Sequence, residues 1–188
     1  MPYASRAGEK LEHAIKVFDI NIADMVCADF GSSTGGFVDC LLQFGAKKVY
    51  AVETGYGVLD YKLRTNDKVI VMERKNAMHV ELPEKADFIS IDTSWTRLDK
   101  IMPNALKNLK ADGKIVTLVK PHYEAETSML RKGKLSEEYI PEVLESVKSR
   151  LKNLDIKILN ETESPILGEK GKNREFLFFI THSAKLVS

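Results

Sequence analysis

The segment 28–39, Ala-Asp-Phe-Gly-Ser-Ser-Thr-Gly-Gly-Phe-Val-Asp, constrains the fold of this chain more than any other. A short apolar run ends there in a glycine-rich turn and continues at once as a predicted helix. In α/β proteins such a turn lies at the carboxyl end of a sheet, where nucleotide-like cofactors bind. The turn has neither Gly-x-Gly-x-x-Gly nor the Gly-Lys-Ser/Thr ending of a phosphate loop, so its pattern alone leaves the cofactor open.

Apolar runs with strand character alternate with helical segments along the chain. The predicted strands are Val26–Phe30, Lys48–Val52, Val69–Met72, Phe88–Asp92, Ile115–Val119, Ile156–Glu161 and Glu175–His182. The predicted helices are Ser5–Phe18 with Ser5 as N-cap, Gly36–Phe44, Val58–Arg64, Leu98–Leu109 and Ser136–Leu151. The alternation predicts an α/β, Rossmann-like fold: a mostly parallel sheet with helices on both faces. The last two strands, joined by a loop, can pair antiparallel.

Length and charge limit the possible functions. A chain of 188 residues fits one domain. Twenty-eight Lys and Arg against 27 Asp and Glu give a net charge of +1, so a nucleic-acid surface would have to be a local patch.

Cysteine usage and hydropathy favour a cytoplasmic protein. Cys27 and Cys40 are interpreted as buried, reduced thiols, and no Cys/His cluster indicates a metal. No signal-peptide core is present, and no apolar run approaches the ~20 residues of a membrane span. We therefore expect a soluble protein with no membrane partner and no metal.

Charged residues follow three of the predicted strands. Glu53 comes 22 positions after Gly31, where an acidic side chain can accept hydrogen bonds from the hydroxyls of a ribose. The alternative is an ion pair with a nearby lysine such as Lys48. Asp92 can cap the next helix or project into the crevice at the strand ends. Lys120, before Pro121, can be a solvated terminus or a crevice residue.

Several motifs occur together in a fixed order. They are Ser-Arg-Ala-Gly-Glu-Lys-Leu at 5–11, Asp-Phe-Gly-Ser-Ser-Thr-Gly-Gly-Phe at 29–37, Leu-Val-Lys-Pro-His-Tyr-Glu at 118–124 and Asn-Arg-Glu-Phe-Leu at 173–177. Between them stand Tyr-Ala-Val-Glu-Thr-Gly-Tyr-Gly at 50–57 and Glu-Arg-Lys-Asn at 73–76. From about Tyr3 to His182 the chain resembles the TlyA (haemolysin A) family of FtsJ-like, S-adenosylmethionine-dependent ribosomal RNA 2′-O-methyltransferases.

The resemblance implies a seven-stranded sheet with an antiparallel last strand. It also implies a catalytic tetrad of Lys10, Asp92, Lys120 and Glu175, with S-adenosylmethionine as cofactor and RNA, either ribosomal RNA or a ribosomal subunit, as partner. The cofactor-binding residues that we predict are Asp29, Gly31, Ser33, Thr34, Gly35, Gly36, Phe37, Glu53, Asn76 and Asp92.

The chain departs from the family pattern at several positions, and each departure leaves the four catalytic groups in place. Ala7 replaces Gly, Phe30 a small aliphatic residue, Ser32 Ala, Glu53 Asp, His122 Gln and Trp95 Phe. The family usually carries an N-terminal S4 RNA-binding domain, and this chain starts where that domain would end. We therefore expect a single domain over 1–188, without an S4 domain, whose N-terminal helix within 1–20 carries Lys10.

The residue types suit proton removal from a weakly acidic ribose hydroxyl. We predict that Lys120 is the base, that Lys10 stabilises the developing alkoxide and that Asp92 holds the Lys120 amine. Glu175 would orient Lys10 or the hydroxyl. Backbone N–H groups of 31–36 would bind the methionine carboxylate. Asn76 would bind the adenine edge or simply stabilise a turn.

A basic group near the carboxyl-terminal third could contact RNA. Its members are Arg131, Lys132, Lys134, Lys170, Lys172 and Arg174. A charge run is often only a solvated surface. The rival functions are methyl transfer to a base or small molecule, and a non-catalytic module that binds cofactor or RNA.

Overall fold

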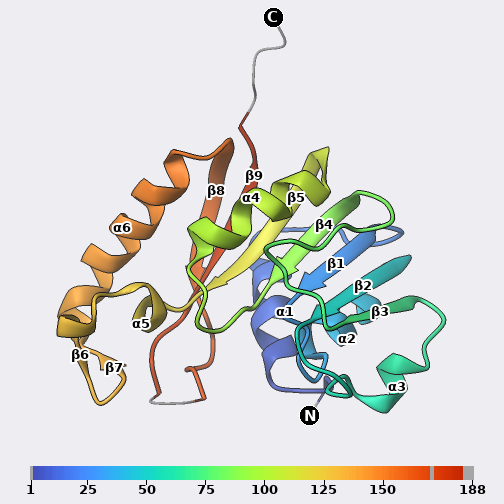
Figure 1. The fold of residues 1–188 in the computed structure, drawn as a ribbon, viewed down its shortest axis with the longest axis horizontal. Coiled ribbons are helices and arrows are strands. Elements are labelled where there is room, and N and C mark those ends of the chain that lie inside the picture. The colour runs from blue at the N-terminus through green and yellow to red at the C-terminus, as the bar shows by residue number, and fades with distance from the viewer. Residues whose placement is uncertain (1, 170–171, 184–188) are drawn as a thin grey trace, which may run out of the picture.

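A seven-stranded sheet forms the centre of the computed structural model, which describes residues 2–169 and 172–183 (Figure 1). The strand order is β3-β2-β1-β4-β5-β9-β8. The strands are β1 (Val26–Phe30), β2 (Lys48–Glu53), β3 (Val69–Glu73), β4 (Ala86–Ile91), β5 (Leu109–Val119), β8 (Ile156–Glu163) and β9 (Phe176–His182). Strands β1 to β5 pair parallel, and β9 is antiparallel to β5 and β8. The predicted mostly parallel sheet with an antiparallel last strand is confirmed.

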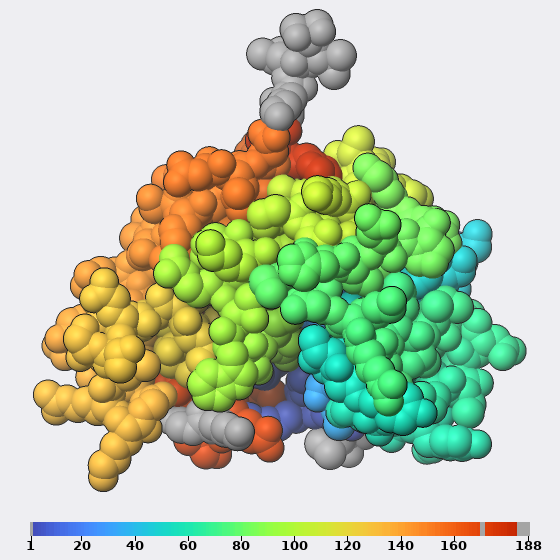
Figure 2. All heavy atoms as spheres, in the orientation of Figure 1, coloured from blue at the N-terminus to red at the C-terminus, as the bar shows by residue number. Residues whose placement is uncertain are grey.

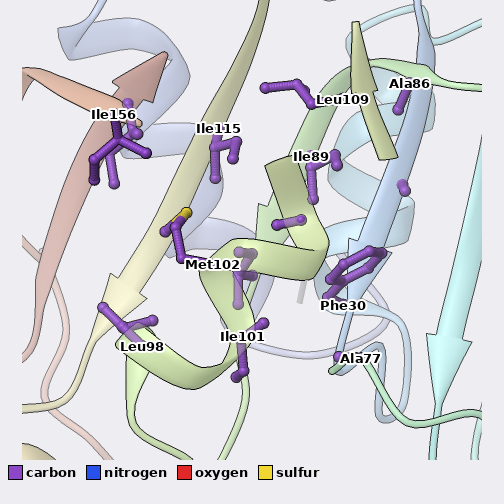
Figure 3. Close-up of a cluster of buried hydrophobic side chains, with 14 of the residues drawn as sticks. Phe30, Ala77, Ala86, Ile89, Leu98, Ile101, Met102, Leu109, Ile115 and Ile156 are labelled. Carbon is purple, nitrogen blue, oxygen red and sulfur yellow. The ribbon is translucent and has the colours of Figure 1, made fainter. Parts of the chain in front are cut away.

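Helices cover both faces of the sheet. On one face lie α1 (Ala7–Val17), α2 (Gly36–Gln43) and the short α3 (Tyr61–Arg64), and on the other lie α4 (Leu98–Asn108) and α6 (Ile140–Lys152) (Figure 1). All five residues of β1 are buried because both of its faces are covered. Figure 3 shows Ile101 and Met102 of α4 packed toward Phe30, Ile89 and Ile115 of the sheet.

Two predicted helix starts differ from the structure. Ser5 is not the N-cap of α1: Arg6 occupies that position without a side-chain capping bond. The Ser5 hydroxyl instead lies so close to Gly36 that a Cβ there would be 2.3 Å from it. The predicted helix from Val58 is only the single turn α3, because Asp60 caps it and accepts a hydrogen bond from the Lys62 N–H.

Two short elements are absent from the sequence prediction. One is the helical turn α5 (Pro121–Glu124), and the other is the hairpin of β6 (Leu130–Arg131) and β7 (Lys134–Leu135). Elements of two to four residues are too short to show a hydrophobic period. The long helix predicted from 136 begins at Ile140, after a 3-10 turn at Glu137–Tyr139.

The two cysteines and the lengths of the helices bear on the expectations of reduced thiols and of no membrane span. Cys27 and Cys40 are buried and free, as predicted. Within residues 2–169 and 172–183, every helix is too short or too polar to cross a bilayer.

Candidate active site

The carboxyl ends of the parallel strands open into a cavity of about 540 Å³. Parallel strands all end at the same edge of the sheet, so residues that follow β1, β4 and β5 meet there. Figure 2 shows this lower edge hollowed, with blue atoms of the N-terminal segment visible inside the opening. All four predicted catalytic side chains line the cavity: Lys10, Asp92, Lys120 and Glu175.

Two ion pairs organise these four side chains. Lys10 Nζ of α1 lies 2.5 Å from Glu175 Oε2, just before β9, and both side chains are less than a tenth exposed. Lys120 Nζ lies 2.5 Å from Asp92 Oδ1, and these side chains are 13% and 18% exposed. The four candidate catalytic side chains therefore form two pairs of opposite charge in the cavity.

The charge state of Lys120 follows from its neighbours. Burial alone lowers the pKa of its ammonium, but the adjacent Asp92 carboxylate, and more weakly Glu175, outweigh burial. The net result is a pKa raised above the ordinary value for lysine. Lys120 is therefore protonated in the unliganded protein, and proton acceptance by its amine requires a change in the local charge.

The glycine turn after β1 lies close to the segment that follows β4 and carries Asp92. Gly31 has φ +90°, and a Cβ there would be 2.4 Å from the Asp92 carbonyl oxygen. At Gly36 a Cβ would meet the Ser5 hydroxyl at 2.3 Å and the Gly8 nitrogen at 2.9 Å. Side chains at these positions would push apart the segments that carry Asp92 and Lys10.

Most N–H groups of the turn already have acceptors. Gly31 and Ser32 donate to the Val52 carbonyl, Ser33 donates to Glu53 and Gly35 donates to the Ser32 carbonyl. The first N–H groups of α2, beginning at Gly36, have no acceptor within the helix. We expected the N–H groups of the whole turn, 31–36, to be available to a carboxylate. In the structure, the available ones lie at the end of the turn, where α2 begins.

Asp29 is a buried carboxyl group at the start of the turn. It is 1% exposed, and its Oδ1 accepts a hydrogen bond of 2.7 Å from the Ser90 hydroxyl. Its Oδ2 is buried and has no hydrogen-bond partner in the described part of the chain, and the side chain lines the cavity. Burial, with added repulsion from Asp92 and Glu53, raises the pKa of Asp29 to about 8. An unpaired acceptor at this depth fits a cationic ligand group.

A second cavity of about 380 Å³ adjoins the first and is lined by Glu53 and Asn76. Gly31, Ser33 and Asp92 line both cavities. The two volumes therefore form one continuous region along the ends of the strands.

Glu53 and Asn76 both have local hydrogen bonds in this region. The Glu53 carboxylate accepts from the N–H groups of Ser33 and Gly55, each at 2.8 Å. Lys48 pairs with Glu84 instead, which removes the alternative partner considered for Glu53. Asn76 Oδ1 accepts from the Met78 N–H, so Asn76 stabilises a turn while it lines the cavity.

The predicted RNA-contacting residues are distributed unevenly. Arg131, Lys132 and Lys134 are exposed on the β6–β7 hairpin, and Lys172 is exposed near β9. Arg174 donates two hydrogen bonds of 2.6 Å to the Glu163 carboxylate, so its guanidinium already has an anionic partner. Lys170 lies outside the described residues.

Two further side chains at the cavity were noted in the sequence only as departures from a family pattern. Trp95 is 78% exposed at φ +64°, and its ring contacts that of Tyr123 at a tilt of 35°, with centroids 4.8 Å apart. His122 is buried, and its Nδ1 has no hydrogen-bond partner among the described residues. Burial, together with Lys120 and Lys10, lowers the pKa of His122 to about 4, so its ring is neutral. The available signal in the sequence was that Trp95 lies four residues after the end of β4 and that His122 lies two residues after Lys120.

Comparisons with known proteins agree with this geometry. The model of the FtsJ-like methyltransferase family matches residues 3–181. Hemolysin A of Brachyspira hyodysenteriae is 41% identical over 181 residues, which cover 93% of this chain and 75% of the relative. The 16S/23S rRNA (cytidine-2′-O)-methyltransferase TlyA of Mycobacterium tuberculosis is 32% identical, over 99% and 71%. A structure named "Putative hemolysin from Streptococcus thermophilus" superposes with a TM-score of 0.94 at 38% identity, over 98% and 69%.

Proposed function

Because this chain belongs to the FtsJ-like methyltransferase family, we propose that it transfers a methyl group from S-adenosylmethionine to a ribose 2′-hydroxyl of ribosomal RNA. The observation that carries the proposal is the meeting of two lysine–carboxylate pairs in one cavity at the carboxyl edge of the sheet: Lys10–Glu175, which is buried, and Lys120–Asp92, which is partly exposed. The relative from Mycobacterium tuberculosis is named as an rRNA (cytidine-2′-O)-methyltransferase, which supports the ribose 2′-hydroxyl as acceptor.

The residues at the two cavities fit the parts of S-adenosylmethionine. Asp29, with its unpaired buried Oδ2, would accept the ammonium of the methionine moiety. The free N–H groups at the start of α2 would bind the carboxylate. Glu53 would bind the ribose hydroxyls and Asn76 the adenine edge, both at the second cavity. When bound, the cofactor supplies an electrophilic methyl group attached to a positively charged sulfur.

The chain's own side chains would manage the proton of the acceptor hydroxyl. Positive charge entering the cavity counteracts the stabilisation that Asp92 gives to the Lys120 ammonium, and so favours the neutral amine. Lys120 would then take the hydroxyl proton as the oxygen gains its methyl group. Lys10, fixed by Glu175, would stabilise the negative charge that develops on the oxygen.

RNA would approach along the lower edge of the molecule. The exposed cations of the β6–β7 hairpin and Lys172 would contact phosphates. For Lys170 and Arg174, RNA contact stays a prediction from the sequence. Trp95 offers an exposed aromatic face at the mouth of the cavity, on which an unpaired base can stack.

The decisive test is transfer of labelled methyl from S-adenosylmethionine to ribosomal RNA, presented free and as assembled subunits. The product is digested to nucleosides, and the label is assigned to the sugar or the base. Label on a ribose 2′-oxygen is expected. Label on a base would replace the ribose acceptor in the proposal, and cofactor binding without transfer to either substrate would indicate a non-catalytic module.

A further inference from the structure

Asn173 makes three hydrogen bonds that tie together separate segments near the cavity. Its Oδ1 accepts from the Leu135 N–H at 3.0 Å, and its Nδ2 donates to the Gly133 carbonyl at 3.1 Å. Its own carbonyl accepts from the Gly168 N–H at 2.8 Å. The side chain is 3% exposed. The amide thus pairs with the hairpin backbone much as a neighbouring strand would.

The hairpin needs such an anchor. Each of its strands, β6 and β7, has only two residues, and an isolated hairpin of this size is not stable in water. Its tip, Lys132-Gly133, has positive φ at both residues. Apart from the Asn173 amide, each strand of the hairpin contributes one leucine, Leu130 or Leu135, to an apolar cluster that includes Phe176.

The hairpin presents unneutralised positive charge. Arg131, Lys132 and Lys134 are all exposed, and none has an ion-pair partner within residues 2–169 and 172–183. Three exposed cations on one short hairpin favour a polyanion, such as a nucleic-acid backbone, as their partner.

Asn173 lies two residues before the catalytic candidate Glu175. A Cβ at Gly168, the residue that donates to Asn173, would be 2.6 Å from Glu175 Oε1. Phe176, directly after Glu175, belongs to the same apolar cluster as Leu135. The hairpin and the Lys10–Glu175 pair are therefore attached to the same short stretch of chain.

From these contacts we infer that Asn173 is a positioning residue: it holds the β6–β7 hairpin as a fixed phosphate-binding arm beside Glu175. The inference rests on the proposed function, because the arm is useful only if the substrate is RNA. Its physical basis is that phosphate contacts supply binding energy that orients a distant reacting group. Without Asn173 the same three cations would be present but would no longer be held relative to the cavity.

The test is a double-mutant cycle between Asn173→Ala and a charge-removal variant of the hairpin, Arg131→Gln/Lys132→Gln/Lys134→Gln. Ribosomal RNA is the probe, and its KM and the slope of log KM against log salt are measured for the parent, each variant and the combination. Asn160→Ala, an exposed asparagine on β8, is the matched control. Asn173→Asp keeps the acceptor for Leu135 while losing the donor to Gly133, and serves if the alanine variant unfolds.

The expected result is that Asn173→Ala raises the KM for RNA and reduces the salt slope by about 2, as the hairpin variant does, because each lost phosphate contact removes roughly 0.7–0.9 from the slope. The combined variant should show little further loss. S-adenosylmethionine affinity should stay within about twofold of the parent, whereas a general loss of structure would reduce it.

Fully additive losses in the combined variant, or an unchanged salt slope in both Asn173 variants, would overturn the inference while leaving the proposed function intact. If the parent protein neither binds nor methylates RNA, the proposed function fails and the inference fails with it. The parent measurement therefore separates the two failures.

Discussion

Lys120 and Asp92 form an ion pair of 2.5 Å between Nζ and Oδ1 at the edge where β4 and β5 end. The two strands pair parallel, so residues that directly follow them are brought together although they are 28 positions apart. The contact keeps Lys120 protonated, since Asp92 raises the pKa of its ammonium despite burial. In the proposed mechanism, the Lys120 amine of the free protein is therefore in the form that cannot accept a proton from a hydroxyl.

Two substitutions of Lys120 test whether the residue acts by accepting a proton or only by carrying a positive charge. Both Lys120→Met and Lys120→Arg should lower kcat by roughly 10²–10⁴, because arginine keeps the charge but cannot accept a proton at neutral pH. S-adenosylmethionine binding should persist. Calorimetry and single-turnover methyl transfer measure the two effects, with Lys107→Met, an exposed lysine of α4, as control. Substantial activity in Lys120→Arg would contradict the role as a base.

The Lys10–Glu175 pair should contribute to stability as well as to activity. Removing one partner of a buried pair leaves an unpaired charge, so Glu175→Leu should cost about 3–5 kcal/mol in urea unfolding. Lys10→Met/Glu175→Leu should recover part of this loss without recovering methyl transfer. The surface pair Lys16–Glu12 is the control, and its removal should cost less than about 1 kcal/mol. Equal costs for the two pairs would argue against this account.

Cofactor binding should release a proton from Asp29. The pKa of this carboxyl is raised to about 8, so it is mostly protonated at pH 7, and a cationic ligand group beside it favours the carboxylate. Affinity for S-adenosylmethionine should therefore increase as pH rises toward about 8 and level off above it. Titration calorimetry at pH 7 in two buffers of different ionisation enthalpy measures the released proton.

The same shift affects the stability of the unliganded protein. The folded state retains the Asp29 proton up to about pH 8, whereas the unfolded state loses it near 3.8, so this carboxyl makes stability fall as pH rises between those values. Asp29→Asn should abolish both the proton release and this contribution. Equal proton release in the parent and in Asp29→Asn would assign the proton to another group.

Trp95 should matter for RNA and not for folding. Its side chain is 78% exposed, so Trp95→Ala should leave thermal stability nearly unchanged. Loss of a stacked base costs about 1–3 kcal/mol, which predicts a rise in the KM for RNA of roughly five- to 150-fold. Trp95→Phe should retain most of the affinity. Steady-state kinetics with Tyr61→Ala, another exposed aromatic, as control would show whether the effect is specific to the cavity mouth.

Gly31 should tolerate no side chain. Gly31→Ala forces a Cβ toward the Asp92 carbonyl and imposes an unfavourable positive φ, so it should lower stability, cofactor affinity and methyl transfer together. Gly57→Ala has φ +70° but meets no atom within 4 Å, and should show only the backbone cost of about 1–2 kcal/mol. Thermal unfolding and cofactor titration of both variants distinguish the two contributions.

Local patterns were sufficient to predict much of this molecule. The apolar run, glycine turn and helix at 26–43 and the alternation of strands and helices could be read from these patterns, whereas the four candidate catalytic residues were expected only from the family resemblance. They could be read because strand and helix periods and turn chemistry depend on neighbouring residues. The same reasoning placed a cap at Ser5, which instead lies against Gly36, and began the helix at Val58, whereas the local cap at Asp60 starts α3 at Tyr61.

The sequence by itself determined which chemical groups are available and that several of them follow strands. The contacts of Lys120 with Asp92 and of Lys10 with Glu175 were expected from the family resemblance, and the tertiary structure contains both. The tertiary structure alone decided that Asn173 binds a hairpin too short to predict. It also decided that most N–H groups of the turn are occupied and that Lys120 is protonated. Pairing and pKa depend on distance and burial between residues far apart in sequence, and the strand order and packing of the folded sheet set both.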